Sequence, residues 1–455
     1  MINRMFFVFA VLMAFSGIGL NAQEKWEPLF NGKNLKGWKQ LNGSATYKVV
    51  KGELVGTTVL SSPNSFLCTA RNYGDFILEY EAWVDPRLNS GVQIRSHSYP
   101  EYQNGRVHGY QVEIDPSDRA WSAGIYDESR RAWLYPLTDN KEAQKAFRNN
   151  EWNHFRVEAI GTRIRTWING IPAANLIDDV DSSGFIGLQV HGIGNDPEKV
   201  GIQVKWRNIR ILTDHPEKYL KPMPLSVKEI SFIPNTLTIN EIKDGWKLLW
   251  DGKTTHGWRG ADKSGFPEKG WKVEDECLVV EAGNGGEAAQ GGDILTVETF
   301  KDFEFSVDFM LTPGANSGIK YFVAEGLNKG IGSAIGLEFQ LLDDKLHPDA
   351  AQGVGGNRTC GALYDLIPPL PARKVNAPGQ WNNARIVAKG SHVEHWLNGI
   401  LIVEYERGTQ MYRALVQKSK YASYPSFGEA DRGPILLQDH GNRVQFRNIK
   451  VRTLN

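Results

Sequence analysis

The sequence is poor in cysteine and has no excess of either charge. Only three cysteines, Cys68, Cys277 and Cys360, occur among 455 residues. They are too few and too scattered for a disulfide framework or a cysteine-based zinc site, and at most Cys277 pairs with Cys360. The 52 basic residues are balanced by 52 acidic ones, so no polybasic surface exists for nucleic acid or anionic lipid. We therefore expect no nucleic-acid partner.

Long apolar runs are also missing, except for one at the N-terminus. The run from Met5 to Leu20 follows Arg4 and ends shortly before Ala22, which is the pattern of a signal peptide. We predict that residues 1–22 form a signal peptide cleaved after Ala22, with an uncleaved anchor as the alternative. No later run reaches eighteen apolar residues, so we expect a periplasmic or secreted protein that has no membrane partner after cleavage.

Helical periodicity is nearly absent, and alternation with period two takes its place. Apolar residues fall on one face in segments such as 76–83, 336–341 and 444–449, a pattern typical of half-buried antiparallel strands. A short helical candidate spans Lys141 to Arg148. With 47 glycines in the chain and frequent Asn-Gly turns, the pattern predicts all-β sandwiches or jelly rolls.

The chain repeats itself once. LFNGKNLKGW at 29–38 returns as LWDGKTTHGW at 249–258, and Asn-Ser-Gly at 89–91 returns at 316–318. Near the ends, LQVHG at 188–192 matches LQDHG at 437–441. Because such blocks keep the same order in both halves, we predict two tandem domains, residues 26–213 and 246–455. The intervening residues 214–245 contain four prolines and are predicted to be an ordered linker.

These motifs resemble the 3-keto-disaccharide hydrolase domain family. The resemblance rests on the LFNGK opening with Gly-Trp, the Asn-Ser-Gly strand, the strand Gly336 to Gln340, and the Leu-Gln-x-His-Gly closing, and it covers both repeats. It implies a concanavalin-like lectin or glucanase sandwich in each domain, a carbohydrate partner, and activity on sugars oxidised at carbon 3.

Strand alternation selects candidate residues for a sugar site. In the second repeat, Leu337, Phe339 and Leu341 point to the core, which directs Glu338 and Gln340 to the opposite face. In the first repeat, the same reasoning directs Gln111, Glu113 and Asp115 outward. Compared with Glu338 in the second repeat, the carboxylate of Glu113 lies two positions further along the same face. Outward polar residues on a half-buried strand are otherwise only solvated.

Two histidines recur in matched motifs. His191 and His440 follow Gln189 and Gln438 by two residues, so each pair shares one strand face. Imidazole exchanges protons near neutral pH, and we assign catalytic roles to Glu113, His191, Glu338 and His440. The alternative for each histidine is a structural residue that caps a turn.

Further candidates for substrate binding are cations and a recurring Tyr-Asp pair. Arg95 and Lys320 alternate away from the core on the strand after Asn-Ser-Gly, where a cation could stabilise an enolate. Tyr126-Asp127 and Tyr364-Asp365 recur at matching places. No metal-ligand spacing stands out, although outward Glu, Asp and His from several strands could assemble a divalent site, so the cofactor is left open.

The interpretation favoured by the resemblance is hydrolysis of 3-keto-glycosides. A ketone at carbon 3 acidifies the hydrogen at carbon 2, so elimination across carbons 1 and 2 followed by hydration would give net hydrolysis. A non-catalytic, lectin-like carbohydrate-binding protein is the main alternative. An ordinary retaining glucanase is the other, because Glu113 and Asp115 lie two residues apart on one strand.

Overall fold

The computed structural model describes residues 25–283, 286, 288, 290–327 and 332–454, so the predicted signal peptide lies outside the described residues. The chain divides into two compact units, one reaching residue 222 and the other running from residue 223 to the end, with residues 175–180 grouped in the second. No helix in these described ranges is long and apolar enough to cross a membrane.

The regular structure of both units is nearly all β-strand, with 41% of the residues in strands against 8% in helices. The prediction of two tandem all-β sandwiches is therefore confirmed. The three α-helices among the described residues are short: α1 (Lys141–Gln144), α2 (Ile239–Lys243) and α3 (Gln410–Gln417). The helix expected over residues 141–148 forms only in its first half.

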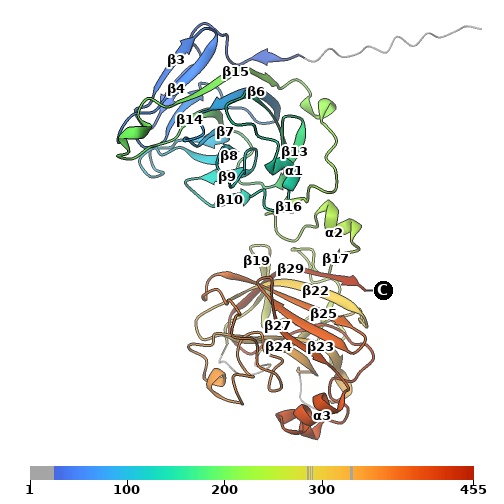
Figure 1. The fold of residues 1–455 in the computed structure, drawn as a ribbon. Helices are drawn as coiled ribbons and strands as arrows, with labels where there is room; N and C mark the ends of the chain where they lie inside the picture. The colour runs from blue at the N-terminus through green and yellow to red at the C-terminus, as the bar shows by residue number, and fades with distance from the viewer. Residues whose placement is uncertain (1–24, 284–285, 287, 289, 328–331, 455) are drawn as a thin grey trace, which may run out of the picture. The chain divides into compact units, whose positions relative to one another are not determined.

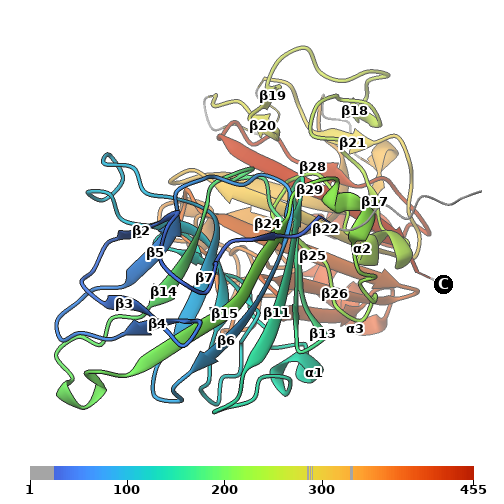
Figure 2. The same ribbon diagram turned by 90° about the horizontal axis from the view of Figure 1, so that it is seen from above.

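The first unit forms a smaller sheet and most of a larger one, whose strand β16 and the end of β13 belong to residues grouped with the second unit. Figures 1 and 2 show these strands from two sides. The larger sheet has the order β16-β13-β12-β11-β6-β15-β4-β3, with β1 paired to β15, and the smaller has the order β10-β9-β8-β7-β14-β5-β2. The strands of the larger sheet are β1 (Glu27–Pro28), β3 (Thr46–Val50), β4 (Glu53–Thr57), β6 (Phe76–Val84), β11 (Asn153–Ile160), β12 (Arg163–Ile168), β13 (Ile171–Ile177), β15 (Gln203–Leu212) and β16 (Ile230–Ser231). Those of the smaller sheet are β2 (Trp38–Leu41), β5 (Ser65–Thr69), β7 (Ser90–His97), β8 (His108–Ile114), β9 (Ile125–Glu128), β10 (Ala132–Tyr135) and β14 (Phe185–Val190).

The second unit repeats this plan with two sheets of its own. The larger follows the order β19-β20-β29-β22-β25-β26-β27, with β17 paired to β29, and the smaller follows β18-β21-β28-β23-β24. The strands of the larger sheet are β17 (Lys247–Leu248), β19 (Trp271–Glu274), β20 (Cys277–Val280), β22 (Phe303–Leu311), β25 (Trp381–Lys389), β26 (His392–Leu397), β27 (Ile400–Glu406) and β29 (Val444–Thr453). Those of the smaller sheet are β18 (Trp258–Gly260), β21 (Ile294–Thr296), β23 (Asn316–Ala324), β24 (Ile335–Leu342) and β28 (Leu436–Leu437).

Short 3₁₀-helices join several of these strands. They are η1 (Pro197–Lys199), η2 (Pro216–Tyr219), η3 (Glu325–Leu327), η4 (Pro348–Ala351) and η5 (Lys420–Ser423). The segment predicted as a linker, residues 214–245, contains η2, β16 and α2. Thr238 begins α2 with a capping box, because its hydroxyl accepts from the Glu241 amide while the Glu241 carboxylate accepts from Thr238.

The repeated sequence motifs make the same turns in both units. The side-chain oxygen of Asn31 accepts from the backbone nitrogen of Lys33 at 2.8 Å, and Asp251 does the same for Lys253 at 2.9 Å. The glycine between the two residues of each pair has a positive φ, +70° at Gly32 and +79° at Gly252, a conformation that other residues rarely adopt. Matching local chemistry thus bends the chain in the same way twice.

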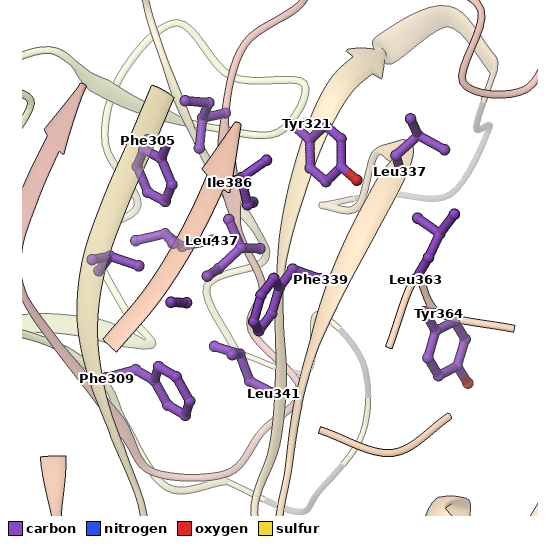
Figure 3. Packing of buried hydrophobic residues seen from close by; sticks show 14 of the residues in the cluster. Phe305, Phe309, Tyr321, Leu337, Phe339, Leu341, Leu363, Tyr364, Ile386 and Leu437 are labelled. Atoms are coloured by element: carbon purple, nitrogen blue, oxygen red, sulfur yellow. The ribbon is translucent and has the colours of Figure 1, made fainter. Parts of the chain in front are cut away.

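The core of the second unit lies between its two sheets. Phe339 and Leu341 on β24 point into the core, on whose other side Phe305 and Phe309 of β22 lie (Figure 3), and these four residues and Leu337 are at most 1% exposed. The alternation predicted for this strand is therefore confirmed. All three cysteines are buried and free, so the pairing of Cys277 with Cys360 does not form.

Candidate active site

The candidate site of the first domain is built on β8, where alternate residues face opposite sides. Tyr110, Val112 and Ile114 are fully buried in the core, which leaves Gln111 and Glu113 on the other face. Gly91 on β7 lies opposite Glu113 in register. A Cβ atom at Gly91 would come within 2.4 Å of the Gln111 side chain, so glycine is needed there to make room for this pair.

A chain of side-chain amides holds Glu113 in place. Ser96 Oγ donates to Gln93 Oε1 at 2.7 Å, Gln93 Nε2 to Gln111 Oε1 at 2.7 Å, and Gln111 Nε2 to Glu113 Oε2 at 2.9 Å. Asn89 Nδ2 donates to the other carboxylate oxygen at 2.6 Å. The hydrogen bonds therefore all run toward Glu113, and each of its two carboxylate oxygens accepts one.

The pKa of the buried Glu113 carboxyl is shifted. Burial raises the pKa of Glu113 to about 7, although the hydrogen bonds from Asn89 and Gln111 act in the opposite direction. A carboxyl group with this pKa can take up and release a proton near neutral pH. This is the property required of a general base or acid.

Glu113 opens into a cavity of about 400 Å³, which we call the inner cavity. The structure brings five of the predicted site residues together there, namely Gln111, Glu113, Tyr126, Gln189 and His191. The other lining residues are Asn64, Asn89, Arg106, Arg119, Glu128 and Trp133. A cavity with these polar and aromatic groups is within the size range of small-molecule sites.

Gln189 on β14 lines the inner cavity. It is fully buried, and neither its amide nitrogen nor its oxygen has a hydrogen-bond partner among the described residues. Unpaired buried polar atoms cost about 1–3 kcal/mol each. A bound molecule with a hydroxyl or carbonyl group would satisfy this amide.

The tautomer of His191 follows from its hydrogen bond to Gly192. Its Nδ1 lies 2.8 Å from the carbonyl oxygen of Gly192, which can only accept. Nδ1 therefore carries the proton, and in the neutral ring Nε2 is the basic nitrogen. Protonation at Nε2 would turn the same atom into a hydrogen-bond donor and an acid.

An aromatic wall flanks the inner cavity. Tyr126 and Trp121 each pack edge-on against Trp133, with ring centroids 5.2 and 4.7 Å apart. The guanidinium of Arg119 lies 4.8 Å from the Trp133 ring, and its Nε donates to Asp115 at 2.7 Å. Rings held in this way offer a rigid surface against which a sugar can pack.

The carboxylates of Asp115 and Asp127 accept hydrogen bonds from neighbouring residues in the sequence. Asp115 accepts from Ser117 and Arg119 in the turn that follows β8 and does not line the inner cavity. Asp127 is fully buried and accepts from Arg130 at 2.8 Å and Arg131 at 2.6 Å. Neither carboxylate faces the cavity where Glu113 lies.

Arg95 lies apart from the inner cavity because β7 contains a bulge. The register with β8 shifts between Ile94 and His97, and Arg95 has a φ of +46°. Its guanidinium is fully buried and donates to the carbonyl oxygens of Gly74 and Gly161 and to the Asp75 carboxylate. Arg95 therefore secures neighbouring loops, whereas the register places Gln93 opposite Gln111.

The second domain places a carboxylate and an amide on β24. Glu338 is 5% and Gln340 1% exposed, and a Cβ atom at Gly318 would come within 2.2 Å of Glu338 Oε1. Gln340 lies between Asn316 and Glu338. Its amide is best satisfied when its nitrogen donates to Glu338 Oε1 at 3.2 Å and its oxygen faces the Asn316 side chain.

Lys320 is a buried cation with a partner. Its Nζ donates to Asp293 and to the carbonyl oxygen of Ala334, each at 3.2 Å. In register it lies directly opposite Glu338. Its counterpart in the first domain is thus Gln93, not Arg95.

The closing motif of the second domain also contains buried polar atoms without partners, but they are not the same atoms as in the first. Gln438 Oε1 and His440 Nδ1 are buried without a partner among the described residues. The neighbouring Asp439 accepts from the backbone nitrogens of Gly291, Gly292 and Gly441 and so stabilises a loop.

Tyr364 and Asp365 likewise form hydrogen bonds within the second domain. The Tyr364 hydroxyl donates to Asp349 at 2.7 Å, and burial raises its pKa. Asp365 accepts from Arg358 at 2.7 Å and from the backbone of Lys420 at 2.8 Å. Like Asp127 with its arginines, Asp365 is a carboxylate that anchors a loop.

One group of described residues offers three metal-type ligands. His392, Glu394 and Glu404 have ligand atoms within 4.8 Å of one another on β26 and β27. This group belongs to the larger sheet of the second domain, whereas Glu338 lies on the smaller one. It is therefore separate from both candidate sites.

Sequence reasoning missed several residues of the inner cavity. Asn89 was visible in the Asn-Ser-Gly motif, so it had a signal. Asn64, Arg106 and Glu128 come from loops or strand ends without periodicity. For these three, the sequence offers no signal.

The chain matches a family model in two segments, residues 25–212 and 245–452, described as a 3-keto-alpha-glucoside-1,2-lyase-like domain. These segments cover most of the chain. The protein belongs to this family. Both copies of the motif pattern fall inside the matched segments.

Known proteins resemble the chain over about half its length. A 3-keto-disaccharide hydrolase of Bacteroides thetaiotaomicron is 37% identical over 232 residues, which is 47% of this chain and 79% of the relative. A crystal structure of a candidate glycosyl hydrolase from Parabacteroides distasonis is 30% identical, with a TM-score of 0.44 over 49% of this chain and all of the other. A second such structure from that organism is 25% identical, with a TM-score of 0.34 over 46% and 99%.

Proposed function

We propose that the chain cleaves 3-keto-glycosides in the inner cavity of the first domain. The observation that carries the proposal is that Glu113, Gln189 and His191 line one cavity, the first with a pKa near 7 and the second with an unpaired buried amide. The family description and the name of the Bacteroides relative support the same substrate class.

The first step is removal of the hydrogen at carbon 2, which the ketone at carbon 3 makes acidic. The carboxylate of Glu113 takes this proton, and the Gln189 amide donates to the enolate oxygen that develops at carbon 3. Because two donors fix the Glu113 carboxylate, little rearrangement is needed when the proton is transferred.

The second step breaks the bond between carbon 1 and the glycosidic oxygen. The electron pair of the enolate forms the double bond between carbons 1 and 2, and protonated His191 gives its Nε2 proton to the departing oxygen. Water then adds to carbon 1 of the enone, and carbon 2 receives a proton. The sum is hydrolysis without a glycosyl-enzyme intermediate.

Retaining glucanase chemistry finds less support. It requires two carboxyl groups roughly 5–5.5 Å apart on either side of the bond. The predicted partner of Glu113 was Asp115, and its carboxylate is occupied by Ser117 and Arg119 outside the inner cavity.

The test uses the whole chain with a 3-keto-disaccharide in D₂O. We expect release of the free sugar and enzyme-dependent deuterium at carbon 2 of the 3-keto product, after correction for exchange without enzyme. Release without that deuterium would overturn the elimination route. Binding without any release would support the lectin-like alternative, and cleavage of an unoxidised glucan would support a glucanase.

We also propose that the protein acts in the periplasm or outside the cell, and that residues 26–213 and 246–455 are its two domains. The apolar segment at residues 5–20 supports the location. Detection of a mature N-terminus at Gln23 in an extracellular or periplasmic fraction would test it.

A further inference from the structure

A second and larger cavity adjoins the inner cavity in the first domain. Its volume is about 810 Å³, against about 400 Å³ for the inner one, and we call it the outer cavity. The two share four lining residues, Asn64, Arg106, Glu128 and His191. The proton donor proposed for the leaving group, His191, therefore lies at their boundary.

The chemical character of the lining changes at this boundary. The residues that line only the outer cavity are all uncharged, and they include the amides and hydroxyls of Asn42, Ser61, Ser62, Gln103, Asn104 and Asn195. The inner cavity holds Glu113 and Arg119 in addition to the shared charged residues. Beyond His191, then, the lining offers neutral amides and hydroxyls.

The loops that form the outer cavity are fixed to one another. Asn42 donates to the Gly105 carbonyl at 3.0 Å and accepts from the Val107 nitrogen at 2.6 Å. Ser61 Oγ lies 2.6 Å from Asn195 Oδ1. This leaves Asn195 Nδ2 with no partner among the described residues, as a donor free for a ligand.

We propose that the outer cavity binds the leaving-group side of an oligosaccharide, as two or more neutral sugar residues. This rests on the proposed function, which puts the oxidised ring beside Glu113 and the scissile oxygen at His191. The part of the substrate beyond that oxygen then enters the outer cavity. Neutral amides and hydroxyls pair with sugar hydroxyls, and the greater volume exceeds what the inner cavity offers its single ring.

The experiment compares three substrates that carry the same 3-keto-glucose ring: a methyl glycoside, a disaccharide and a trisaccharide oxidised at the non-reducing end. We expect the kcat/KM of the wild-type chain to be at least about tenfold higher for the trisaccharide than for the methyl glycoside. The variant Asn195→Trp places a bulky ring in the lining of the outer cavity. It should lower kcat/KM for the trisaccharide at least about tenfold more than for the methyl glycoside.

Thr46→Trp is the matched control, because Thr46 is exposed on β3 of the other sheet and lines neither cavity. It should change neither value. Thermal melting checks that each variant is folded, and Asn195→Ala replaces Asn195→Trp if the larger side chain prevents folding, with a smaller loss confined to the longer substrates.

Equal kcat/KM for the three wild-type substrates, or equal losses on all of them in the Asn195 variants, would overturn the inference while leaving the proposed function intact. Failure of the wild-type chain to cleave any of the three would instead overturn the proposed function.

Discussion

The two domains place a carboxylate and an amide on equivalent strands in exchanged order. On β8, Gln111 lies opposite Gln93 and Glu113 opposite Gly91. On β24, Glu338 lies opposite Lys320 and Gln340 opposite Gly318. The carboxylate has therefore moved two positions along the same face, and the residue opposite it differs.

The frame around this pair is the same in both domains. In each domain an asparagine lies at the start of the strand and a glycine makes room for the pair; these residues are Asn89 and Gly91 in the first domain and Asn316 and Gly318 in the second. A buried glutamine and a histidine follow on another segment of each domain: Gln189 and His191, and Gln438 and His440. The comparison teaches that duplication retained the scaffold of the site while its titratable group changed place. The chemistry of one domain cannot be transferred to the other by motif alone.

Replacing each carboxylate in turn should give the largest difference in activity between the two domains. Glu113→Gln should lower kcat on a 3-keto-disaccharide about 10³-fold, because it removes the proposed base, whereas Glu338→Gln should lower it less than about tenfold. Steady-state kinetics on folded variants would measure both. A large loss in Glu338→Gln alone would move the reaction to the second domain.

The histidines provide a second comparison. His191→Gln should lower kcat about 10²-fold with folding intact, because glutamine keeps hydrogen bonding but cannot transfer a proton. His440→Gln should have a much smaller effect. Full activity in the double variant would remove histidine from the mechanism.

The pH profile tests the state of Glu113. A base must be ionised, and with a pKa near 7 its ionised fraction rises as pH increases toward 7. We expect kcat/KM to fall about tenfold per pH unit below that value. A profile that is flat from pH 5 to pH 7 would contradict this assignment.

The smallest expected effect concerns stability. Glu113→Gln turns an amide nitrogen toward one of the donors Asn89 and Gln111, whereas the exchange Gln111→Glu with Glu113→Gln recreates the order of the second domain, in which every donor meets an acceptor. The double variant should exceed the single one by about 1–2 kcal/mol in free energy of unfolding. Urea denaturation at pH 7 would show it, and a double variant less stable than the single one would count against the amide chain.

Much of this arrangement was predictable from the sequence because strands alternate with period two. Leu337, Phe339 and Leu341 pointed to the core as expected, which placed Glu338 and Gln340 on the other face. Duplication then identified Gln189 and His191 without any structure. Such reasoning works wherever a strand stays regular.

It stops where the backbone departs from regularity. The bulge after Ile94 removes Arg95 from the face that simple alternation assigns to it, because one positive φ reorients the side chain. Asn64 and Arg106 reach the inner cavity from loops, whose paths depend on tertiary contacts. Pairing of Asp127 and Asp365 with arginines was equally invisible, since both carboxylates looked like site residues.

The unpaired Gln189 amide also bears on how long the protein survives where it works. The Gln189 side chain has no hydrogen-bond partner among the described residues, and a ligand that binds only the folded form shifts the equilibrium away from the unfolded one. Proteases cut chains that have opened, and occupied molecules open less often. If sugar binds as proposed above, occupied molecules should therefore be cut more slowly by a protease than unoccupied ones.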